Sequence, residues 1–255
     1  MKTKFLILAL LMQSTFAVFS QPKTVEYKDG NQILSGLSIL PAKQLKNNPG
    51  VLILPAWMGI QDHEKEVSYK LADLGYQSFI ADIYGVDQRP NNSKEAGAKA
   101  GYFKKNIKEY QTRIQLAMEQ LVKQGANPDE IVVIGYCFGG TGALEAARAN
   151  MKVKGIVSFH GGLGRDETRI IENIIPKVLI LHGADDKYVP KEEVEKFQDE
   201  MRTSGADWQM VYYANAVHSF ANKSAGSDNS KGAAYNEKAE KRSWEAMLNF
   251  LKEVL

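Results

Sequence analysis

Residues 131–143 read IVVIGYCFGGTGA, and this stretch decides the fold. Its first four residues are apolar and predict a strand buried on both faces, and the small residues that follow through Arg148 predict a helix. Cys137 stands at the turn between them, with Gly135 two residues before it and Gly139 two residues after it. This spacing is typical of a nucleophile elbow, a strained turn in which side chains at the glycine positions would collide with neighbouring backbone.

The rest of the chain alternates apolar strand patterns with helical ones. The expected strands span residues 33–40, 51–54, 76–83, 131–135, 153–159, 178–181 and 208–213, and the other expected helices span 62–74, 107–124, 190–202 and 231–255. Turn-rich segments at 27–31 and 85–93 separate some of these elements. Such alternation predicts right-handed crossovers, and therefore an α/β fold with a mainly parallel central sheet and helices on both faces. Residues 21–255 show no linker or shift in composition, so we expect one domain.

The composition favours chemistry on a small molecule. The chain has 255 residues, with 32 Lys and Arg against 30 Asp and Glu, and this near-neutral balance argues against nucleic acid or an anionic membrane surface as a partner. Cys137 is the single cysteine of the sequence. A single cysteine excludes an intramolecular disulfide and a zinc site built from cysteine pairs. Nothing in the sequence implies a metal or an organic cofactor.

Residues 1–20 read MKTKFLILALLMQSTFAVFS, the pattern of a secretory signal peptide. Two lysines precede a short apolar stretch, and cleavage is expected after Ala17 or Ser20. The apolar part is shorter than the roughly 20 residues that a spanning helix needs, and a retained N-terminal anchor is the alternative. We therefore expect an exported protein, periplasmic or extracellular, without a membrane span. In an oxidising compartment a lone thiol is a liability unless it has a function.

The thiol of Cys137 needs a base. The N-terminus of a helix stabilises a nearby thiolate by about 0.3–1 kcal/mol, which is less than one pKa unit at about 1.36 kcal/mol. From an ordinary pKa of about 8.5, the helix alone leaves the thiol mostly protonated at neutral pH. A buried structural cysteine is the alternative interpretation, but the flanking glycines and the helix of small residues favour a nucleophile.

Two later segments offer a base and a carboxylate. Residues 178–190 read VLILHGADDKYVP, and residues 211–220 read VYYANAVHSF. Each carries polar residues just after a strand pattern, at the carboxyl edge where open α/β sheets gather ligands. The order nucleophile, acid, histidine is known for such folds, so His218 is the candidate base, with a structural histidine as the alternative. His160 is interpreted as a residue that shapes a loop or lines the site, and His63 as an exposed residue in the first turn of a helix.

Three segments together resemble the dienelactone hydrolase family of the α/β-hydrolase fold, namely GYCFGG at 135–140, LHGADDKYVP at 181–190 and YANAVHSF at 213–220. The similarity runs over nearly the whole chain after residue 20. A cysteine at the elbow is its specific feature, because most members of the wider fold carry serine there. The resemblance implies hydrolysis of a small ester or lactone, of the carboxymethylenebutenolidase type.

The resemblance also implies roles for individual residues. Cys137 would be the nucleophile, and His218 the base and then the acid. Asp186 would orient the histidine, because the acid of the family lies three residues after the glycine of this segment. The oxyanion hole would consist of two backbone N–H groups, those of Phe138 and Trp57. Loss of one such donor typically costs about 10²–10³ in rate.

The chain departs from the family pattern at three positions. Ala56 stands where the family carries a glutamate beside the thiol, and Val86 and Asn222 stand where it carries arginines for the substrate carboxylate. Arg89 and Lys223 are the basic residues nearest to the two arginine positions. The other candidates for the substrate pocket, several of which core packing would explain equally well, are Met58, Tyr84, His160 and Phe220.

We therefore predict a secreted cysteine hydrolase that cleaves a small ester or lactone through a thioester acyl-enzyme. Two other classes of function stay open. One is a non-catalytic small-molecule-binding protein on the same fold, which the three departures from the family pattern favour. The other is an acyltransferase, in which an acceptor other than water takes the acyl group. The sequence specifies neither the acyl group nor the oligomeric state.

Overall fold

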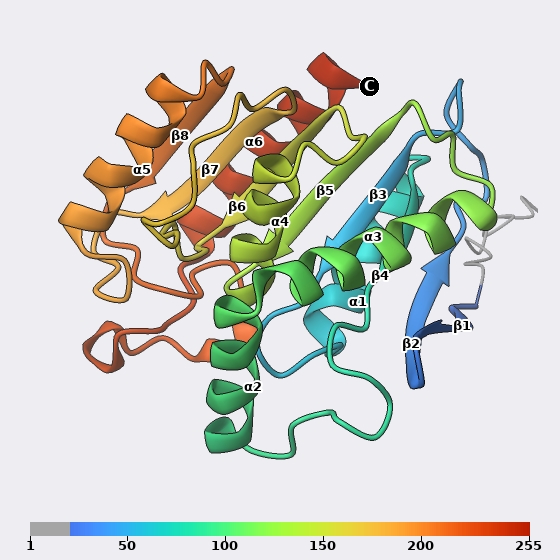
Figure 1. Ribbon diagram of the computed structural model, residues 1–255, viewed down its shortest axis with the longest axis horizontal. Coiled ribbons are helices and arrows are strands. Elements are labelled where there is room, and N and C mark those ends of the chain that lie inside the picture. The colour runs from blue at the N-terminus through green and yellow to red at the C-terminus, as the bar shows by residue number, and fades with distance from the viewer. Residues whose placement is uncertain (1–20) are drawn as a thin grey trace, which may run out of the picture.

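One twisted sheet runs through the protein, with helices packed on both of its faces (Figure 1). The computed structural model describes residues 21–255. Within these residues the sheet has eight strands in the order β1-β2-β4-β3-β5-β6-β7-β8. The strands are β1 Lys23–Asp29, β2 Gln32–Ile39, β3 Gly50–Leu54, β4 Gln77–Ile80, β5 Ile131–Tyr136, β6 Gly155–Phe159, β7 Lys177–Gly183 and β8 Trp208–Tyr213. Only the pairs β1/β2 and β2/β4 are antiparallel, so the predicted mainly parallel sheet is confirmed.

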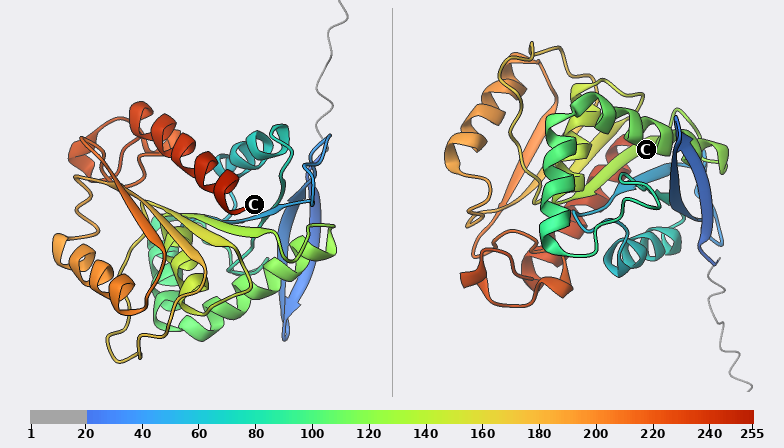
Figure 2. Two further views of the ribbon diagram at one scale, coloured as in Figure 1. Left: turned by 90° about the horizontal axis from the view of Figure 1, so that it is seen from above. Right: turned by 60° about the horizontal axis from the view of Figure 1, so that its bottom comes forward.

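The helices divide between the two faces of the sheet (Figure 2). They are α1 Asp62–Asp73, α2 Ser93–Lys105, α3 Ile107–Lys123, α4 Phe138–Arg148, α5 Lys191–Thr203 and α6 Glu237–Val254, with short 3-10 helices η1 Lys223–Ala225 and η2 Asn229–Lys231. Helices α1 and α6 cover one face, and α2, α3, α4 and α5 cover the other. The predicted α/β architecture with helices on both faces is therefore confirmed.

The central strands are buried on both faces because helices cover both. In β5, Ile131 and Val133 pack into the core on the side of α3 and α4, whereas Val132 and Ile134 pack into the core on the side of α1 and α6. All residues of β3, β5 and β6 are buried. Burying each such side chain contributes about 1.5–3 kcal/mol, so β5, which leads into residue 137, and its two neighbours β3 and β6 are firmly anchored in the core.

The N-terminal strand β1 is absent from the sequence prediction, whose first strand begins at residue 33. The segment 27–31, expected to be a turn, belongs to β1 as far as Asp29, and only Gly30 and Asn31 form the turn. Pairing with β2 extends the strand, and the hydroxyl of the buried Tyr27 donates to the backbone carbonyl of Asp82 at 3.1 Å. Tyr27 and Asp82 lie 55 residues apart in sequence, so local turn propensity could not reveal this contact.

Two helices also differ from the prediction. The sequence pattern does not predict α2, because its buried face consists of Ala96, Ala100 and Phe103 and two alanines give a weak apolar signal. The last helix begins at Glu237 rather than at residue 231. Asn236 is its N-cap and accepts the N–H of Ala239 at 3.1 Å, the usual way in which asparagine begins a helix.

Two predictions about membranes and export concern different parts of the chain. Among the residues that the structure describes, no helix has the length and the apolar character needed to cross a bilayer. The predicted signal peptide, residues 1–20, lies outside the described residues, and export stays a prediction. Every strand from β1 to β8 joins the same sheet, which is compatible with the prediction of one domain.

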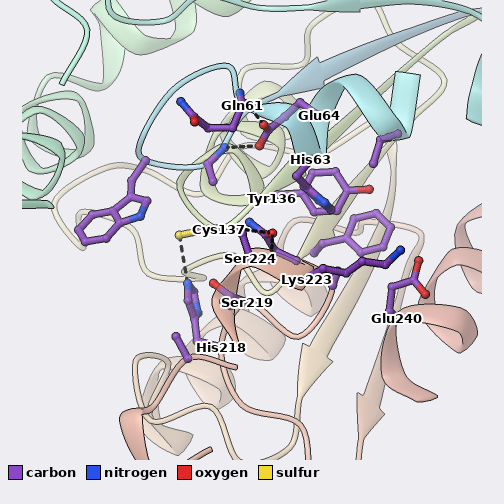
Figure 3. A pocket seen from close by; sticks show the side chains of 18 of the residues that line it. Gln61, His63, Glu64, Tyr136, Cys137, His218, Ser219, Lys223, Ser224 and Glu240 are labelled. Atoms are coloured by element: carbon purple, nitrogen blue, oxygen red, sulfur yellow. Dashed lines mark hydrogen bonds between the residues drawn. The ribbon is translucent and has the colours of Figure 1, made fainter. Parts of the chain in front are cut away.

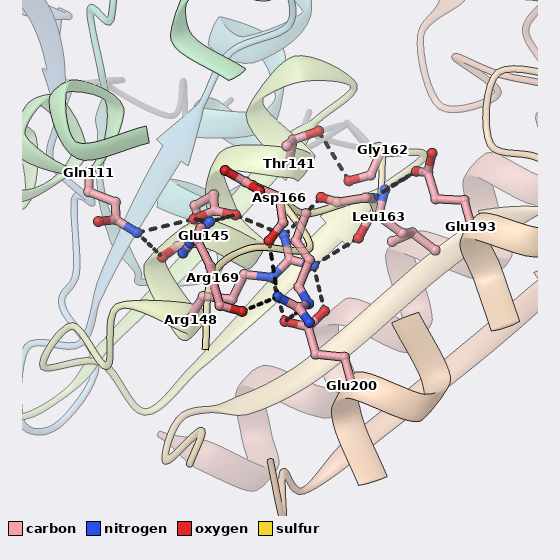
Figure 4. Close-up of polar contacts among 12 residues, drawn as sticks. Gln111, Thr141, Glu145, Arg148, Gly162, Leu163, Asp166, Arg169, Glu193 and Glu200 are labelled. Carbon is pink, nitrogen blue, oxygen red and sulfur yellow. Dashed lines mark hydrogen bonds and ion pairs between the residues drawn. The ribbon is translucent and has the colours of Figure 1, made fainter. Parts of the chain in front are cut away.

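A buried ion-pair network holds the loop that follows β6 (Figure 4). The Arg148 guanidinium donates to both carboxylate oxygens of Glu200, at 2.9 and 2.6 Å, and to Glu145 at 2.8 Å. It also donates to the carbonyl oxygens of Leu163 at 2.8 Å and Gly164 at 3.0 Å. The side chains of the three charged residues are 1–5% exposed. Arg148 thus joins α4 and α5 to the loop at the carboxyl end of β6.

We expect Arg148→Met to lower the free energy of unfolding by about 3–5 kcal/mol, because it removes both hydrogen bonds to the buried Glu200 carboxylate and one of the two arginines that pair with the buried Glu145. Urea unfolding followed by circular dichroism measures the change. The matched control is Lys241→Met, which removes an exposed ion pair with Glu237 in α6 and should change the value by at most about 0.5 kcal/mol. Equal effects of the two substitutions would contradict the assignment of Arg148 as a buried brace.

Candidate active site

The chain makes a strained turn at Cys137, between β5 and α4. The backbone angles of this residue are φ 55° and ψ −113°, a region that residues other than glycine rarely adopt. A Cβ atom on Gly135 would lie 2.0 Å from the carbonyl oxygen of Gly139, and one on Gly139 would lie 2.0 Å from that of Leu54. Both positions therefore require glycine, as the elbow pattern predicts. The Cys137 N–H donates to the carbonyl of Phe159 at 3.0 Å, which ties the turn to β6.

Two loops bring a histidine and a carboxylate to the thiol. His218 Nε2 lies 3.0 Å from Cys137 Sγ (Figure 3), and His218 Nδ1 lies 2.9 Å from Asp186 Oδ2. The Asp186 side chain is 0% exposed, and its other oxygen accepts the N–H of Tyr188 at 2.9 Å. Asp185 is exposed to solvent. Of the two neighbouring aspartates, Asp186 is the one that contacts the histidine.

The His218 loop is held by the segment that leads into α6. His218 lies five residues beyond the end of β8, in the loop that follows the strand predicted at residues 208–213. Its carbonyl oxygen accepts the N–H of Ala234 at 3.0 Å, and the carbonyl of Phe220 accepts the N–H of Asn236 at 3.0 Å. A bridge of β type also joins His218 to Ala233. These contacts substitute for a strand in fixing the ring.

The charges around the thiol favour an ion pair between sulfur and imidazole. Burial raises the pKa of the Cys137 thiol, but the hydrogen bond and charge of His218 outweigh it, with help from the N–H of Phe138 and the charge of Lys104, and the pKa falls below its ordinary value. Burial lowers the pKa of His218, but hydrogen bonds to Asp186 and to Cys137 outweigh it, and the pKa rises. Both changes favour a thiolate beside an imidazolium.

Two buried tyrosines brace the backbone on either side of the thiol. The Tyr84 hydroxyl donates to the carbonyl of Trp57 at 2.8 Å, and the Tyr110 hydroxyl donates to that of Phe138 at 2.9 Å. Both tyrosine rings stack on the Phe138 ring, with interplanar angles of 8° and 4°. The Phe138 N–H is directed at the sulfur of Cys137. Within residues 21–255, the Trp57 N–H donates no hydrogen bond.

Glu64 is a residue of this site that the sequence interpretation misses. Its carboxylate, 1% exposed, accepts the N–H groups of Ala56 at 3.2 Å and Gln61 at 2.9 Å. It therefore closes the loop that carries Trp57. Burial raises the pKa of this carboxyl. Gln61 is the N-cap of α1 and Glu64 is its third residue, and this capping-box spacing is the sequence signal that could have revealed it.

A cavity of about 770 Å³ opens beside the Cys137 sulfur. We call its two parts the front lobe and the inner lobe. The front lobe is lined by Trp57, Met58, Lys104, Gly162, Tyr188 and Val189. The inner lobe continues between α1 and α6 and is lined by His63, Val67, Tyr136, Glu240, Ser243 and Trp244 (Figure 3). Within residues 21–255, no three His, Cys, Asp or Glu side chains are grouped so that they could hold a metal ion.

The basic residues near the cavity differ in part from those that the sequence suggests. Arg89 lies away from it, because its guanidinium donates to Asp82 Oδ2 and to the carbonyl of Ser35, both at 3.0 Å. Lys223 does line the cavity, and so does Lys104 of α2, which the sequence interpretation misses. Neither ammonium group forms an ion pair with another described residue. The positive charge at the cavity therefore comes from lysines.

Of the other pocket candidates, Met58 lines the cavity and three residues do not. Tyr84 is buried as the brace described above. His160 is 2% exposed. The centre of its ring lies 5.3 Å from that of His218, the candidate base, and 5.1 Å from that of Phe220. Phe220 is fully buried. These three aromatic side chains are buried in the core beneath the site and do not contact the cavity.

His63 is not the exposed helix residue that its position in the first turn of α1 predicts. Its ring packs edge-on against the ring of Tyr136, with centroids 4.6 Å apart, and its Nε2 atom is buried without a hydrogen-bond partner. Burial, with the charges of Lys70 and Lys223, lowers the pKa of His63 to about 4. The imidazole is therefore neutral at neutral pH. Tyr136 at the end of β5 supplies the surface that covers this histidine.

Comparison with protein families matches residues 34–255 to the dienelactone hydrolase family. A similar solved structure is that of a dienelactone hydrolase-like promiscuous phosphotriesterase from metagenomic libraries, which is 35% identical, with a TM-score of 0.86 and coverage of 92% of this chain and 98% of that chain. A relative from Aquifex aeolicus (strain VF5) named "Putative carboxymethylenebutenolidase" is 28% identical and covers 81% of this chain and 89% of its own length. A Bradyrhizobium relative named "Probable 2-oxo-3-(5-oxofuran-2-ylidene)propanoate lactonase" is 24% identical, with coverage of 68% and 73%.

We expect iodoacetamide to alkylate Cys137 at pH 6 several-fold faster than it alkylates N-acetylcysteine. The lowered pKa of the thiol leaves more thiolate at this pH, tenfold more per pKa unit, while the intrinsic nucleophilicity falls by only about threefold per unit. The rate should fall as the pH decreases through this lowered pKa. Mass spectrometry of the modified protein over pH 4–9 (roughly the range in which thiols and imidazoles titrate) measures the profile. In His218→Ala the pH dependence of alkylation should move toward that of the free thiol. An unchanged pH dependence would contradict the conclusion that His218 lowers the pKa of Cys137.

Proposed function

The chain belongs to the dienelactone hydrolase family, and from this premise we propose that it hydrolyses a small ester or lactone with Cys137 as its nucleophile. The comparisons support a hydrolase of the dienelactone hydrolase type. The observation that carries the proposal is the 3.0 Å contact between Cys137 Sγ and His218 Nε2 at the mouth of the cavity. A thiol that merely filled space would need neither the strained turn nor the buried carboxylate behind the histidine.

In the first half of the reaction, the Cys137 thiolate attacks the carbonyl carbon of the substrate. The new C–S bond forms as the carbonyl π electrons move to oxygen, and the N–H groups of Phe138 and Trp57 stabilise the resulting oxyanion. The tetrahedral intermediate then expels the alcohol, which takes its proton from His218. A thioester between the acyl group and Cys137 remains. Asp186 keeps the imidazole in the orientation in which Nε2 faces the sulfur.

In the second half, water replaces the alcohol beside the histidine. The neutral His218 removes a proton from the water, which attacks the thioester carbon. The same two N–H groups stabilise the second oxyanion. The C–S bond then breaks, the acid leaves, and the thiolate is restored beside the protonated imidazole. With a lactone, the alcohol and the acid are two ends of one molecule, so the product is the ring-opened acid.

The cavity bears on the class of substrate. Relatives of this chain are named as carboxymethylenebutenolidase and as a lactonase, which favours a lactone. Lys104 and Lys223 line the cavity and would attract an acidic substrate in place of the arginines that the family pattern carries. Arg89 is not available for this purpose because it is paired with Asp82 at 3.0 Å.

The first test is the turnover of p-nitrophenyl acetate by the wild type and by Cys137→Ala. We expect the substitution to lower kcat by at least about 10³, because the residues of such a unit act together. Equal rates would remove Cys137 from the mechanism. Absence of turnover in the wild type would favour the small-molecule-binding alternative, and products that contain an added alcohol or amine would favour the acyltransferase alternative.

Two neighbouring aspartates provide a matched control for this test. Asp186→Asn should lower kcat strongly, because the amide cannot stabilise the imidazolium. Asp185→Asn changes the adjacent carboxylate, which is exposed to solvent, and should leave kcat unchanged within a factor of about two. A loss of activity in both variants would indicate a general effect on the loop and not a role of Asp186.

Hydrolysis of phosphotriesters is a second candidate activity. It is favoured by the similarity to the promiscuous phosphotriesterase, which extends over 92% of this chain at 35% identity. A thiolate can attack phosphorus as well as carbonyl carbon, and the N–H groups near Cys137 could stabilise the phosphoryl oxygen in the same way. Paraoxon hydrolysis by the wild type and by Cys137→Ala would show whether this activity shares the thiol.

We also propose that the protein acts after export, in the periplasm or outside the cell. This part of the proposal rests on residues 1–20 alone, which have the charge and apolar pattern of a signal peptide. An exported enzyme with one reactive thiol and no second cysteine cannot lose its nucleophile to an intramolecular disulfide.

The hydrogen bond from Tyr84 to the Trp57 carbonyl can be tested by substitution. Tyr84→Phe keeps the stacked ring but removes the 2.8 Å hydrogen bond to the Trp57 carbonyl, so the proposed oxyanion donor becomes less well placed. We expect kcat for p-nitrophenyl acetate to fall about three- to tenfold with KM nearly unchanged, given the usual value of one such bond. Tyr102→Phe, which removes an exposed hydroxyl bonded to Glu109 at 2.8 Å, is the control. A change in KM alone would contradict the assignment.

A further inference from the structure

Two large aromatic side chains of the front lobe are exposed to solvent. Trp57 is 38% exposed and Tyr188 is 62% exposed, and both line the cavity beside the Cys137 sulfur. Tyr102 is a further exposed tyrosine, at 51%, but it does not line the cavity. Exposed aromatic rings that face a cavity beside a reactive group are typical of a ligand site. The front lobe therefore offers two aromatic surfaces to a molecule that reaches the sulfur.

Contacts with the backbone hold both rings in place. The N–H of Tyr188 donates to Asp186 Oδ1 at 2.9 Å. The Tyr188 ring packs against Gly232, where a Cβ atom would lie 3.4 Å from ring atom Cε2. The Trp57 ring lies against α2 at Gly97, where a Cβ atom would lie 3.8 Å from ring atom Cζ3. Both rings are thus positioned before a substrate arrives, which lowers the entropy cost of binding.

The alcohol half of the substrate lies beside Tyr188 in the reaction proposed above. There the carbonyl oxygen faces the N–H groups of Phe138 and Trp57, and the leaving oxygen faces His218, which passes it a proton. The centre of the His218 ring lies 5.2 Å from that of the Tyr188 ring. A leaving group that extends from His218 toward solvent therefore contacts the Tyr188 ring.

A thiolate nucleophile restricts the alcohols that can leave. The tetrahedral intermediate can expel either the sulfur or the alcohol oxygen, and the group with the lower pKa leaves more readily. An ordinary thiol has a pKa of about 8.5 and a phenol a pKa of about 10, whereas an alkyl alcohol resembles water, with a pKa of about 15.7. The pKa of Cys137 lies below its ordinary value. Of these alcohols, a phenol competes best with the sulfur as leaving group.

Lys104 adds a positive charge to the front lobe. It lies seven residues after Gly97 on α2, and residues seven apart share one face of a helix. Its ammonium group forms no ion pair with another described residue. Its charge lowers the pKa of Cys137, and the leaving oxygen is bonded to the carbon that this sulfur attacks. The same charge therefore stabilises the negative charge that develops on a phenolic oxygen.

We propose that the front lobe binds an aromatic leaving group against the rings of Trp57 and Tyr188, so that the substrate is an aryl ester or a lactone fused to an aromatic ring. The inference rests on the function proposed above and specifies its leaving half. The bond between the carbonyl carbon and the phenolic oxygen breaks as the thioester forms, and the phenolic oxygen takes the proton of His218. Lys223 lines the cavity near His63 and remains available for an acidic substituent of the acyl half.

The experiment compares phenyl acetate with hexafluoroisopropyl acetate. The two esters share the acyl half and have leaving groups of similar acidity, but the ring is present in one alone. Each kcat/KM is divided by the rate constant for hydrolysis of the same ester by hydroxide, which removes the difference in intrinsic reactivity. We expect the wild type to favour phenyl acetate by about tenfold, the value of contacts with two aromatic rings. In Tyr188→Leu and in Trp57→Leu this preference should fall toward one.

The matched control is Tyr102→Leu, which removes an exposed tyrosine ring outside the cavity and should keep the tenfold preference. Equal corrected values for the two esters in the wild type, or an unchanged preference in Tyr188→Leu or Trp57→Leu, would overturn the inference, while hydrolysis of both esters would still support the proposed function. If neither ester is hydrolysed, the proposed function fails, and calorimetry gives the Kd values of phenol and hexafluoroisopropanol. Tighter binding of phenol by the wild type, lost in Tyr188→Leu, then supports the aromatic site, and equal Kd values overturn it.

Discussion

The site depends on the strained backbone of Cys137, held at φ 55°. Such a conformation costs about 1–3 kcal/mol in a residue that has a side chain, and the buried strand before it and the helix after it maintain it. Two close approaches of backbone, at Gly135 and Gly139, leave no room for another arrangement. The position of the sulfur is therefore set by the buried sheet strands and by α4. His218 and Asp186 approach this sulfur from two loops.

The parts of the site that sequence analysis could predict are those with local causes. The elbow is one contiguous segment, and its apolar strand, its glycines and its small-residue helix all lie within 20 residues of Cys137. The aspartate is harder to predict. The local sequence pattern makes Asp185 and Asp186 equally good candidates for the acid, and only the resemblance to the dienelactone hydrolase family favours Asp186. Burial makes the physical difference between them, and burial is a property of the whole fold.

The parts that could not be predicted depend on contacts between distant segments. Arg89 looked available for a substrate carboxylate, but Asp82 and β2 occupy its guanidinium. Tyr84 looked like a pocket wall, but its hydroxyl turns inward to the carbonyl of Trp57. The first turn of a surface helix is usually exposed, yet a strand end covers His63. No periodicity in the sequence encodes these pairings, because each joins elements whose relative placement the sheet order decides.

The way in which Trp57 is anchored has a consequence for the evolution of the site. Tyr84 and Glu64 hold its loop through a main-chain carbonyl and main-chain N–H groups, and neither contact involves the side chains at positions 57 and 58. Those side chains can be exchanged without loosening the backbone donors beside the sulfur. Selectivity and chemical competence are thus separable under mutation, so a lineage could acquire new substrates by changing the cavity wall while the reacting groups stay in place.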